Sequence, residues 1–178
     1  MSNGICVLAL GIVCGSSAVA AWGQGWGGCN SETIKGDYAV RVSGENFVPP
    51  ATPTALPVIS VYRNGIALVH FNGAGVLSQA DYVSANGVAV PGPPDGNGFH
   101  TDETGTYTVN ENCTGSAEID FPTPPGGTSG AVIKVLFVIS DDGRQINEVV
   151  TSLTPPNSTT PVLTNILADL RRVHSERW

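Results

Sequence analysis

Glu148 is the residue in this chain that is best placed for acid–base chemistry. It alternates with Ile146 and Val150, so in a β-strand its carboxyl group shares a face with apolar side chains. A carboxyl group desolvated by such neighbours has a raised pKa, which suits a general acid or base. A position at the rim of the fold, or an ion pair with an arginine such as Arg41, is the structural alternative.

Two histidines are further candidates. His70 shares a predicted strand face with Ile66 and is the second candidate catalytic residue, because an imidazole exchanges protons near neutral pH. Partial exposure beside a turn is the alternative for His70. His100 stands near Asp102 and Glu103, but one histidine with loosely spaced acids is not a metal-ligand pattern. We therefore expect a solvated loop around His100, no metal site and no cofactor.

Aromatic residues on the predicted strands are the candidate ligand-binding residues, with a role in the core as the alternative. They are Tyr38, Tyr62, Tyr82 and Tyr107.

Paired carboxylates at Glu118 and Asp120 raise the possibility of a glycosidase, which needs two acids a few ångströms apart. Their alternation with Ala117, Ile119 and Phe121 places both acids on the water-facing side, so solubility explains them better. The sequence contains no nucleophile elbow, phosphate-binding loop, dinucleotide fingerprint or zinc-protease motif.

Short strands and tight turns must position these residues. Turn signals at 72–75, 86–87, 110–112 and 141–143 separate runs of alternating or apolar residues, and Asn64-Gly65 is a further hairpin signal. Eight strands are predicted, at 36–43, 58–62, 66–71, 76–83, 106–109, 117–121, 133–140 and 145–153.

The C-terminal segment fits two structures. Leu163, Ile166, Leu167 and Leu170 follow the spacing of one helix face, and Arg171 suits a helix end. The same segment also alternates as a closing strand would. We adopt a short C-terminal helix as the prediction and keep the strand as the alternative.

Composition supports an all-β fold. Only 13% of the 178 residues are charged, whereas the chain has 22 glycines and 13 prolines, which suits short antiparallel strands with many turns. We predict an antiparallel β-barrel of about eight strands that spans a single domain, 36–178. The formal net charge of −7 and the lack of a Lys/Arg cluster argue against nucleic-acid binding.

The N-terminus is typical of an exported protein. An apolar run at 5–13 precedes small residues and the cleavage pattern Ala18-Val19-Ala20, although no basic residue occurs before Lys35. We predict a signal peptide at 1–20, a flexible segment at 21–35, and a secreted or periplasmic protein with no stable membrane insertion after cleavage. A retained apolar strand is the alternative.

Cleavage after Ala20 would leave two cysteines, Cys29 and Cys113. In an exported domain these most economically form one disulfide, and two unpaired buried thiols are the alternative.

Several motifs carry a family resemblance across roughly residues 29–153. IKGDY at 34–38, FNGAG at 71–75 and GTYTVN at 105–110, with the two cysteines, resemble small exported bacterial proteins similar to the allene oxide cyclase barrel-like group of calycin or lipocalin shape. The resemblance implies a barrel whose relatives include isomerases, cyclases and carriers. No catalytic motif of an allene oxide cyclase can be matched residue by residue.

Three functions follow from these expectations. The first is a barrel that binds a small apolar molecule in its lumen. The second is a cyclase or isomerase that holds a flexible apolar substrate there, with Glu148 as proton donor or acceptor. The third is a structural protein with a filled core, in which apolar outer faces of 66–71 and 132–139 support a homo-oligomer.

Overall fold

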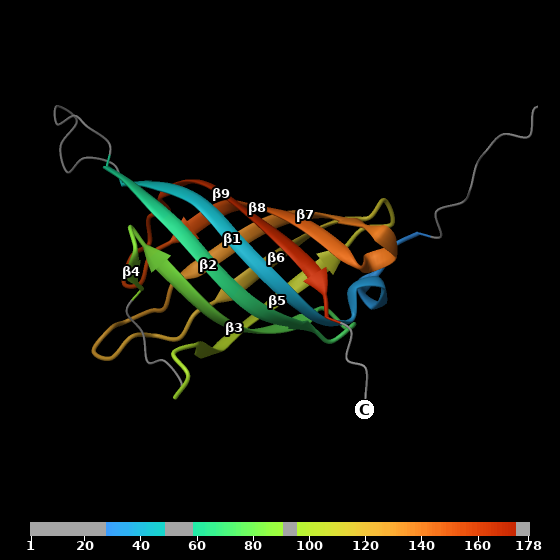
Figure 1. The fold of residues 1–178 in the computed structure, drawn as a ribbon, viewed down its shortest axis with the longest axis horizontal. Helices are drawn as coiled ribbons and strands as arrows, with labels where there is room; N and C mark the ends of the chain where they lie inside the picture. The colour runs from blue at the N-terminus through green and yellow to red at the C-terminus, as the bar shows by residue number, and fades with distance from the viewer. Residues whose placement is uncertain (1–27, 49–58, 91–95, 174–178) are drawn as a thin grey trace, which may run out of the picture.

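The computed structural model describes residues 28–48, 59–90 and 96–173. Eight antiparallel strands close into a barrel, and a two-residue strand, β4, pairs with the end of β3 (Figure 1). Each barrel strand pairs with its neighbours along the chain, and pairing between the first and last strands completes the closure. The strands are β1 (Gly36–Val48), β2 (Ile59–Phe71), β3 (Val76–Ala85), β4 (Val88–Ala89), β5 (His100–Val109), β6 (Thr114–Asp120), β7 (Val132–Ser140), β8 (Gln145–Thr154) and β9 (Leu163–Arg172).

Alternation of side chains along each strand separates the core from the outer surface. On β7, Val135, Phe137 and Ile139 are buried, whereas Leu136 and Val138 are exposed. This period of two is the one the sequence predicts for strands with one face inside the barrel. The predicted all-β barrel is confirmed.

The hairpin expected at Asn64-Gly65 is wrong, because β2 runs through it as one continuous strand. Asn64 pairs with Ser43 on β1 and with Ser84 on β3, so two complete ladders hold this stretch extended. A Cβ on Gly65 would lie 2.8 Å from the carbonyl oxygen of Tyr82. The glycine therefore permits a close approach of β3 and does not form a turn.

The predicted C-terminal helix is also wrong, because the alternative of a closing strand is what forms. β9 pairs with β8 on one side and with β1 on the other. Ile166, Ala168 and Leu170 point into the core, while Leu163 and Leu167 are exposed. Pairing of β9 with both β1 and β8, and burial of one face, thus override the tendency of this apolar spacing to form a helix.

One end of the barrel is closed by the short helical turns η1 (Ser31–Ile34) and η2 (Asp141–Gly143), which lie together at the right of Figure 1. Asn30 caps η1, and Ile34 is fully buried. From Gly28 onward, the segment that we expected to be flexible is therefore packed against the barrel.

The predicted disulfide joins Cys29 to Cys113 beside this closed end, across a sequence separation of 84. Cys113 ends the turn at 110–112 with a positive φ of 63°, and the backbone of Cys29 donates a hydrogen bond to Glu111 O. The bond ties the N-terminal segment to the β5–β6 turn.

The predicted signal peptide at 1–20 lies outside the described residues. Within those residues, no helix combines the length and the apolar character needed to span a membrane.

Candidate functional site

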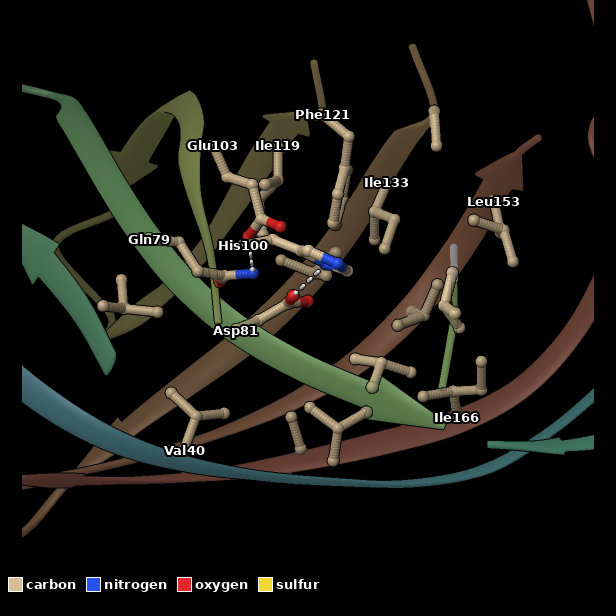
Figure 2. A pocket seen from close by; sticks show the side chains of 18 of the residues that line it. Val40, Gln79, Asp81, His100, Glu103, Ile119, Phe121, Ile133, Leu153 and Ile166 are labelled. Carbon is tan, nitrogen blue, oxygen red and sulfur yellow. Dashed lines mark hydrogen bonds and ion pairs between the residues drawn. The ribbon is translucent and has the colours of Figure 1, made fainter. Parts of the chain in front are cut away.

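A cavity of about 260 Å³ occupies the barrel interior and extends toward the end opposite η1 and η2. Its wall is mainly apolar and includes residues from every barrel strand. Figure 2 shows Gln79, Asp81, His100 and Glu103 gathered in this wall, with apolar side chains around them. The volume lies just below the range of about 300–1,000 Å³ found for small-molecule pockets, so the cavity suits a small ligand.

Glu148 lines the cavity from β8. Its partners across the sheet are Phe137 on β7 and Ala168 on β9, both buried, so its carboxyl group lies in an apolar part of the wall. Desolvation by burial raises the pKa of Glu148 to about 7. The alternative ion pair with Arg41 is not formed, because Arg41 is exposed on the outer face of β1.

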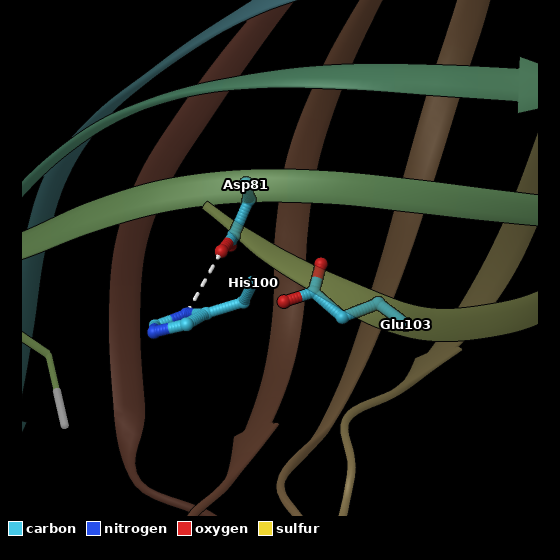
Figure 3. Close-up of side chains that lie close together, drawn as sticks. All are labelled: Asp81, His100 and Glu103. Atoms are coloured by element: carbon cyan, nitrogen blue, oxygen red, sulfur yellow. Dashed lines mark ion pairs between the residues drawn. The ribbon is translucent and has the colours of Figure 1, made fainter. Parts of the chain in front are cut away.

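A second polar group in the wall is formed by Asp81 on β3 and by His100 and Glu103 on β5 (Figure 3). Asp81 is 4% exposed and Glu103 is fully buried. His100 Nδ1 lies 3.3 Å from Asp81 Oδ1, and Gln79 donates a hydrogen bond of 2.8 Å to Glu103 Oε2. We call these three residues the Asp81–His100–Glu103 cluster.

A β-bulge brings the cluster together. Gln79 lies opposite Glu103 and Asp81 opposite His100, so two steps along β3 match three along β5. The extra residue on β5 turns His100 and Glu103 toward the same cavity, although regular alternation would place them on opposite faces. The solvated loop expected around His100 is therefore wrong: its side chain is 16% exposed and belongs to the barrel wall.

Burial dominates the electrostatics of the cluster. It raises the pKa of Glu103 to about 8, and the negative charge of Asp81 acts in the same direction. Burial also raises the pKa of Asp81, and the neighbouring side chains of Glu103 and His100 partly offset this rise. Two carboxyl groups thus share a small desolvated volume, where they favour a proton or a bound cation.

The four tyrosines do not line the cavity. Tyr38 and Tyr107 are buried at the closed end, where each packs edge-on against Phe71. Tyr62 and Tyr82 are exposed on the outer surface. Tyr38 and Tyr107 therefore have the alternative role, as core residues. None of the four tyrosines lines the cavity that contains Glu148.

His70 lies on the outer surface of β2. Its Nδ1 is 2.7 Å from Asp37 Oδ1, and both side chains are about half exposed. The expectation that His70 shares a face with Ile66 is right, but that face points away from the lumen. The structure therefore does not bring His70 together with Glu148.

Sequence reasoning missed Asp81 and Gln79, although a signal was present. Leu77, Gln79, Asp81 and Val83 alternate along β3, so a strand with Leu77 inside also turns the two polar residues inward. Alternation along β6 likewise places Glu118 and Asp120 on the outer face, as the sequence predicted. Glu118 forms a surface ion pair of 2.9 Å with Lys134.

The fold and site together define a closed antiparallel barrel with a mainly apolar cavity. Its wall contains Glu148 and, separately, the Asp81–His100–Glu103 cluster. Comparison of the chain with protein-family models, curated proteins and solved structures finds no match in any of the three. Its function is therefore inferred from the geometry of the site.

Proposed function

We propose that this chain is a binding protein that encloses one small, mainly apolar molecule in the barrel lumen. The observation that supports this function is a cavity of about 260 Å³ whose apolar wall contains an isolated carboxyl group, that of Glu148. Apolar burial would supply most of the affinity. Glu148 would fix the orientation of the ligand by hydrogen bonding to its polar group.

The cavity also bears on the third function expected from the sequence. A structural protein with a filled core would have no interior space of this size, because protein interiors are close-packed. The cavity of about 260 Å³ is therefore evidence against the filled core.

Titration with N-phenyl-1-naphthylamine, an apolar fluorophore with one N–H group, tests binding in the lumen. Ala168→Leu adds volume beside Glu148 within the cavity, whereas Ala39→Leu makes the same change on the exposed outer face of β1. We expect Ala168→Leu to weaken binding roughly tenfold or more, equivalent to about 1.4 kcal/mol, and Ala39→Leu to leave it unchanged.

Circular dichroism must show the same strand content in both variants, and Ala117→Leu on β6 provides a second way to fill the cavity. Equal affinity in the wild type and in both cavity-filling variants would rule out the lumen as the binding site. Mass spectrometry of molecules that co-purify with the wild type would identify the natural ligand class.

The second candidate is a cyclase or isomerase of the allene oxide cyclase-like type. The specific observation in its favour is the pKa of Glu148 near 7, which suits proton transfer at neutral pH. An apolar wall that held the substrate in a reactive conformation would lower the activation barrier of the reaction, so few further catalytic groups would be needed. Loss of turnover of the co-purified molecule in Glu148→Gln, with binding retained, would distinguish the enzyme from the carrier.

Export remains part of the proposal. The disulfide between Cys29 and Cys113 suits an oxidising compartment, as does the predicted signal peptide at 1–20. Mass spectrometry of the secreted or periplasmic protein would test cleavage after Ala20. A protein found only in the cytoplasm with both thiols free would contradict export.

Self-association through the outer surface is a separate prediction. Leu136, Val149 and Leu167 are exposed and occupy directly paired positions on β7, β8 and β9. A contiguous apolar row of this kind favours a homo-oligomer. Light scattering should show that Val149→Lys lowers the oligomeric mass while Asn147→Lys, on the same exposed face, does not.

A further inference from the structure

The Asp81–His100–Glu103 cluster has a donor set that the proposed ligand-binding function does not require. Each residue offers one potential metal-ligating atom, and these three atoms lie within 4.8 Å of one another. The residues come from adjacent strands that pair at this point, so their backbones are fixed by the sheet. Bonds of about 2.0–2.2 Å to a central cation would require small movements of the side chains.

Unpartnered oxygen atoms provide a second, independent observation. Asp81 Oδ1 and Glu103 Oε1 are both inaccessible to solvent, and within the described residues neither accepts a hydrogen bond. The 3.3 Å contact of His100 with Asp81 Oδ1 has the range of an ion pair without the geometry of a hydrogen bond. A buried carboxylate oxygen left in this state is costly, and a bound cation removes the cost.

The chemistry of the donors selects the kind of cation. Imidazole suits zinc and other first-row transition metals, while carboxylates complete such sites readily. Calcium and magnesium prefer sites made entirely of oxygen atoms and would gain little from His100.

Gln79 hydrogen bonds to one of the three candidate ligands, as residues around metal sites commonly do. Its amide donates a hydrogen bond to Glu103 Oε2 and thereby fixes the orientation of that carboxyl group. The oxygen that remains unpaired, Oε1, is the one available to a metal.

We propose that Asp81, His100 and Glu103 bind a divalent first-row transition metal ion, with Zn²⁺ the best-matched occupant. Three protein ligands leave at least one coordination position for water or for a donor atom of a molecule in the lumen. All three residues line the cavity, so that position is reached from the interior of the barrel. The proposed metal site does not include Glu148, and metal binding can be tested without the proposed apolar ligand.

Titration of the untagged, full mature chain with ZnCl₂ in a calorimeter, and with CoCl₂ followed by visible absorption, tests the site. We expect one ion per chain and the absorption bands of low-coordinate Co²⁺. Gln79→Ala should weaken binding by roughly 10–100-fold, and His100→Ala, Asp81→Asn and Glu103→Gln should weaken it at least as much. CaCl₂ and MgCl₂ should not displace Co²⁺.

His70→Ala is the matched control, because His70 and Asp37 also form a histidine–carboxylate pair, but on the exposed outer surface. We expect its metal affinity to equal that of the wild type. Circular dichroism and urea denaturation show whether each variant is folded. The proposal is overturned if the folded wild type binds neither metal stoichiometrically, if His100→Ala binds as tightly as the wild type, or if Ca²⁺ displaces Co²⁺.

Discussion

Tyr38 and Arg172 lie 134 positions apart in the sequence and join the first and last strands of the barrel. Arg172 donates hydrogen bonds to the Tyr38 hydroxyl from Nη2, at 2.8 Å, and from Nε, at 3.1 Å. The hydroxyl in turn donates to the carbonyl of Gly143, and Arg172 Nη2 also donates to Thr33 O. The buried Tyr38 phenol and Arg172 together thus link β1, β9, η1 and η2 at the closed end.

Tyr38→Phe should lower the free energy of unfolding by about 1.5–3 kcal/mol, because it removes hydrogen bonds to the charged, partly buried guanidinium of Arg172 and to the buried carbonyl of Gly143. Urea denaturation followed by circular dichroism measures the change. Tyr62→Phe, on the exposed surface, should alter stability by less than about 0.5 kcal/mol. Fluorophore affinity should be unchanged in Tyr38→Phe; a large loss of affinity would place Tyr38 in the binding site.

Reduction of the disulfide should destabilise the protein. Cys29 and Cys113 close a loop with a sequence separation of 84, for which the chain-entropy relation gives a stabilisation of about 4–5 kcal/mol. The double variant Cys29→Ser/Cys113→Ser should therefore unfold at much lower urea concentration than the oxidised wild type. Adding dithiothreitol should lower the wild-type midpoint and leave that of the double variant in place. A wild-type midpoint unaffected by complete reduction would contradict the prediction.

The fold was predictable to the extent that local pattern controls it. Turn residues and alternation identified most strands, and the count of eight was right for partly compensating reasons: two predicted strands proved to be the single strand β2, and the expected helix proved to be β9. Asn64-Gly65 has a strong local preference for a hairpin. Pairing of this stretch with both neighbouring strands overrides that preference. The residues around Asn64 do not indicate such pairing, because it depends on distant parts of the chain.

The candidate site was predictable only where alternation is regular. Glu148 faces the lumen as its apolar neighbours on β8 indicate. His100 and Glu103 are three residues apart, and only the bulge opposite Gln79 and Asp81 turns both inward. A bulge depends on the partner strand, so the spacing of residues on β5 alone did not indicate it.

His70→Ala should leave fluorophore binding unchanged, because its ring lies on the outer surface of β2 and pairs with Asp37. Loss of this exposed histidine–carboxylate contact should change the free energy of unfolding by less than about 1 kcal/mol. Fluorophore titration of the variant and the wild type measures the affinity, and urea denaturation of both measures the free energy of unfolding. A clear loss of turnover or binding in His70→Ala would restore the catalytic role that the sequence suggested for it.

Glu148 should make the protein less stable as the pH rises toward neutrality. Burial raises its pKa in the folded state from an ordinary value of 4.5 to about 7. Between these two values the unfolded chain has released the proton that the folded chain still holds, so stability falls with increasing pH. The loss levels off about one pH unit above the folded-state pKa and amounts to about 3 kcal/mol.

Glu148→Gln removes this titration while keeping the shape of the side chain, so its stability should fall less than that of the wild type between pH 5 and pH 8. The difference between the two proteins isolates Glu148, because Asp81, His100 and Glu103 are present in both and its direct partners across the sheet, Phe137 and Ala168, carry no charge. Urea denaturation in the presence of EDTA gives the free energies. Parallel pH profiles for the two proteins would mean that the Glu148 carboxyl is well solvated, and its use as an acid or base at neutral pH would lose its physical basis.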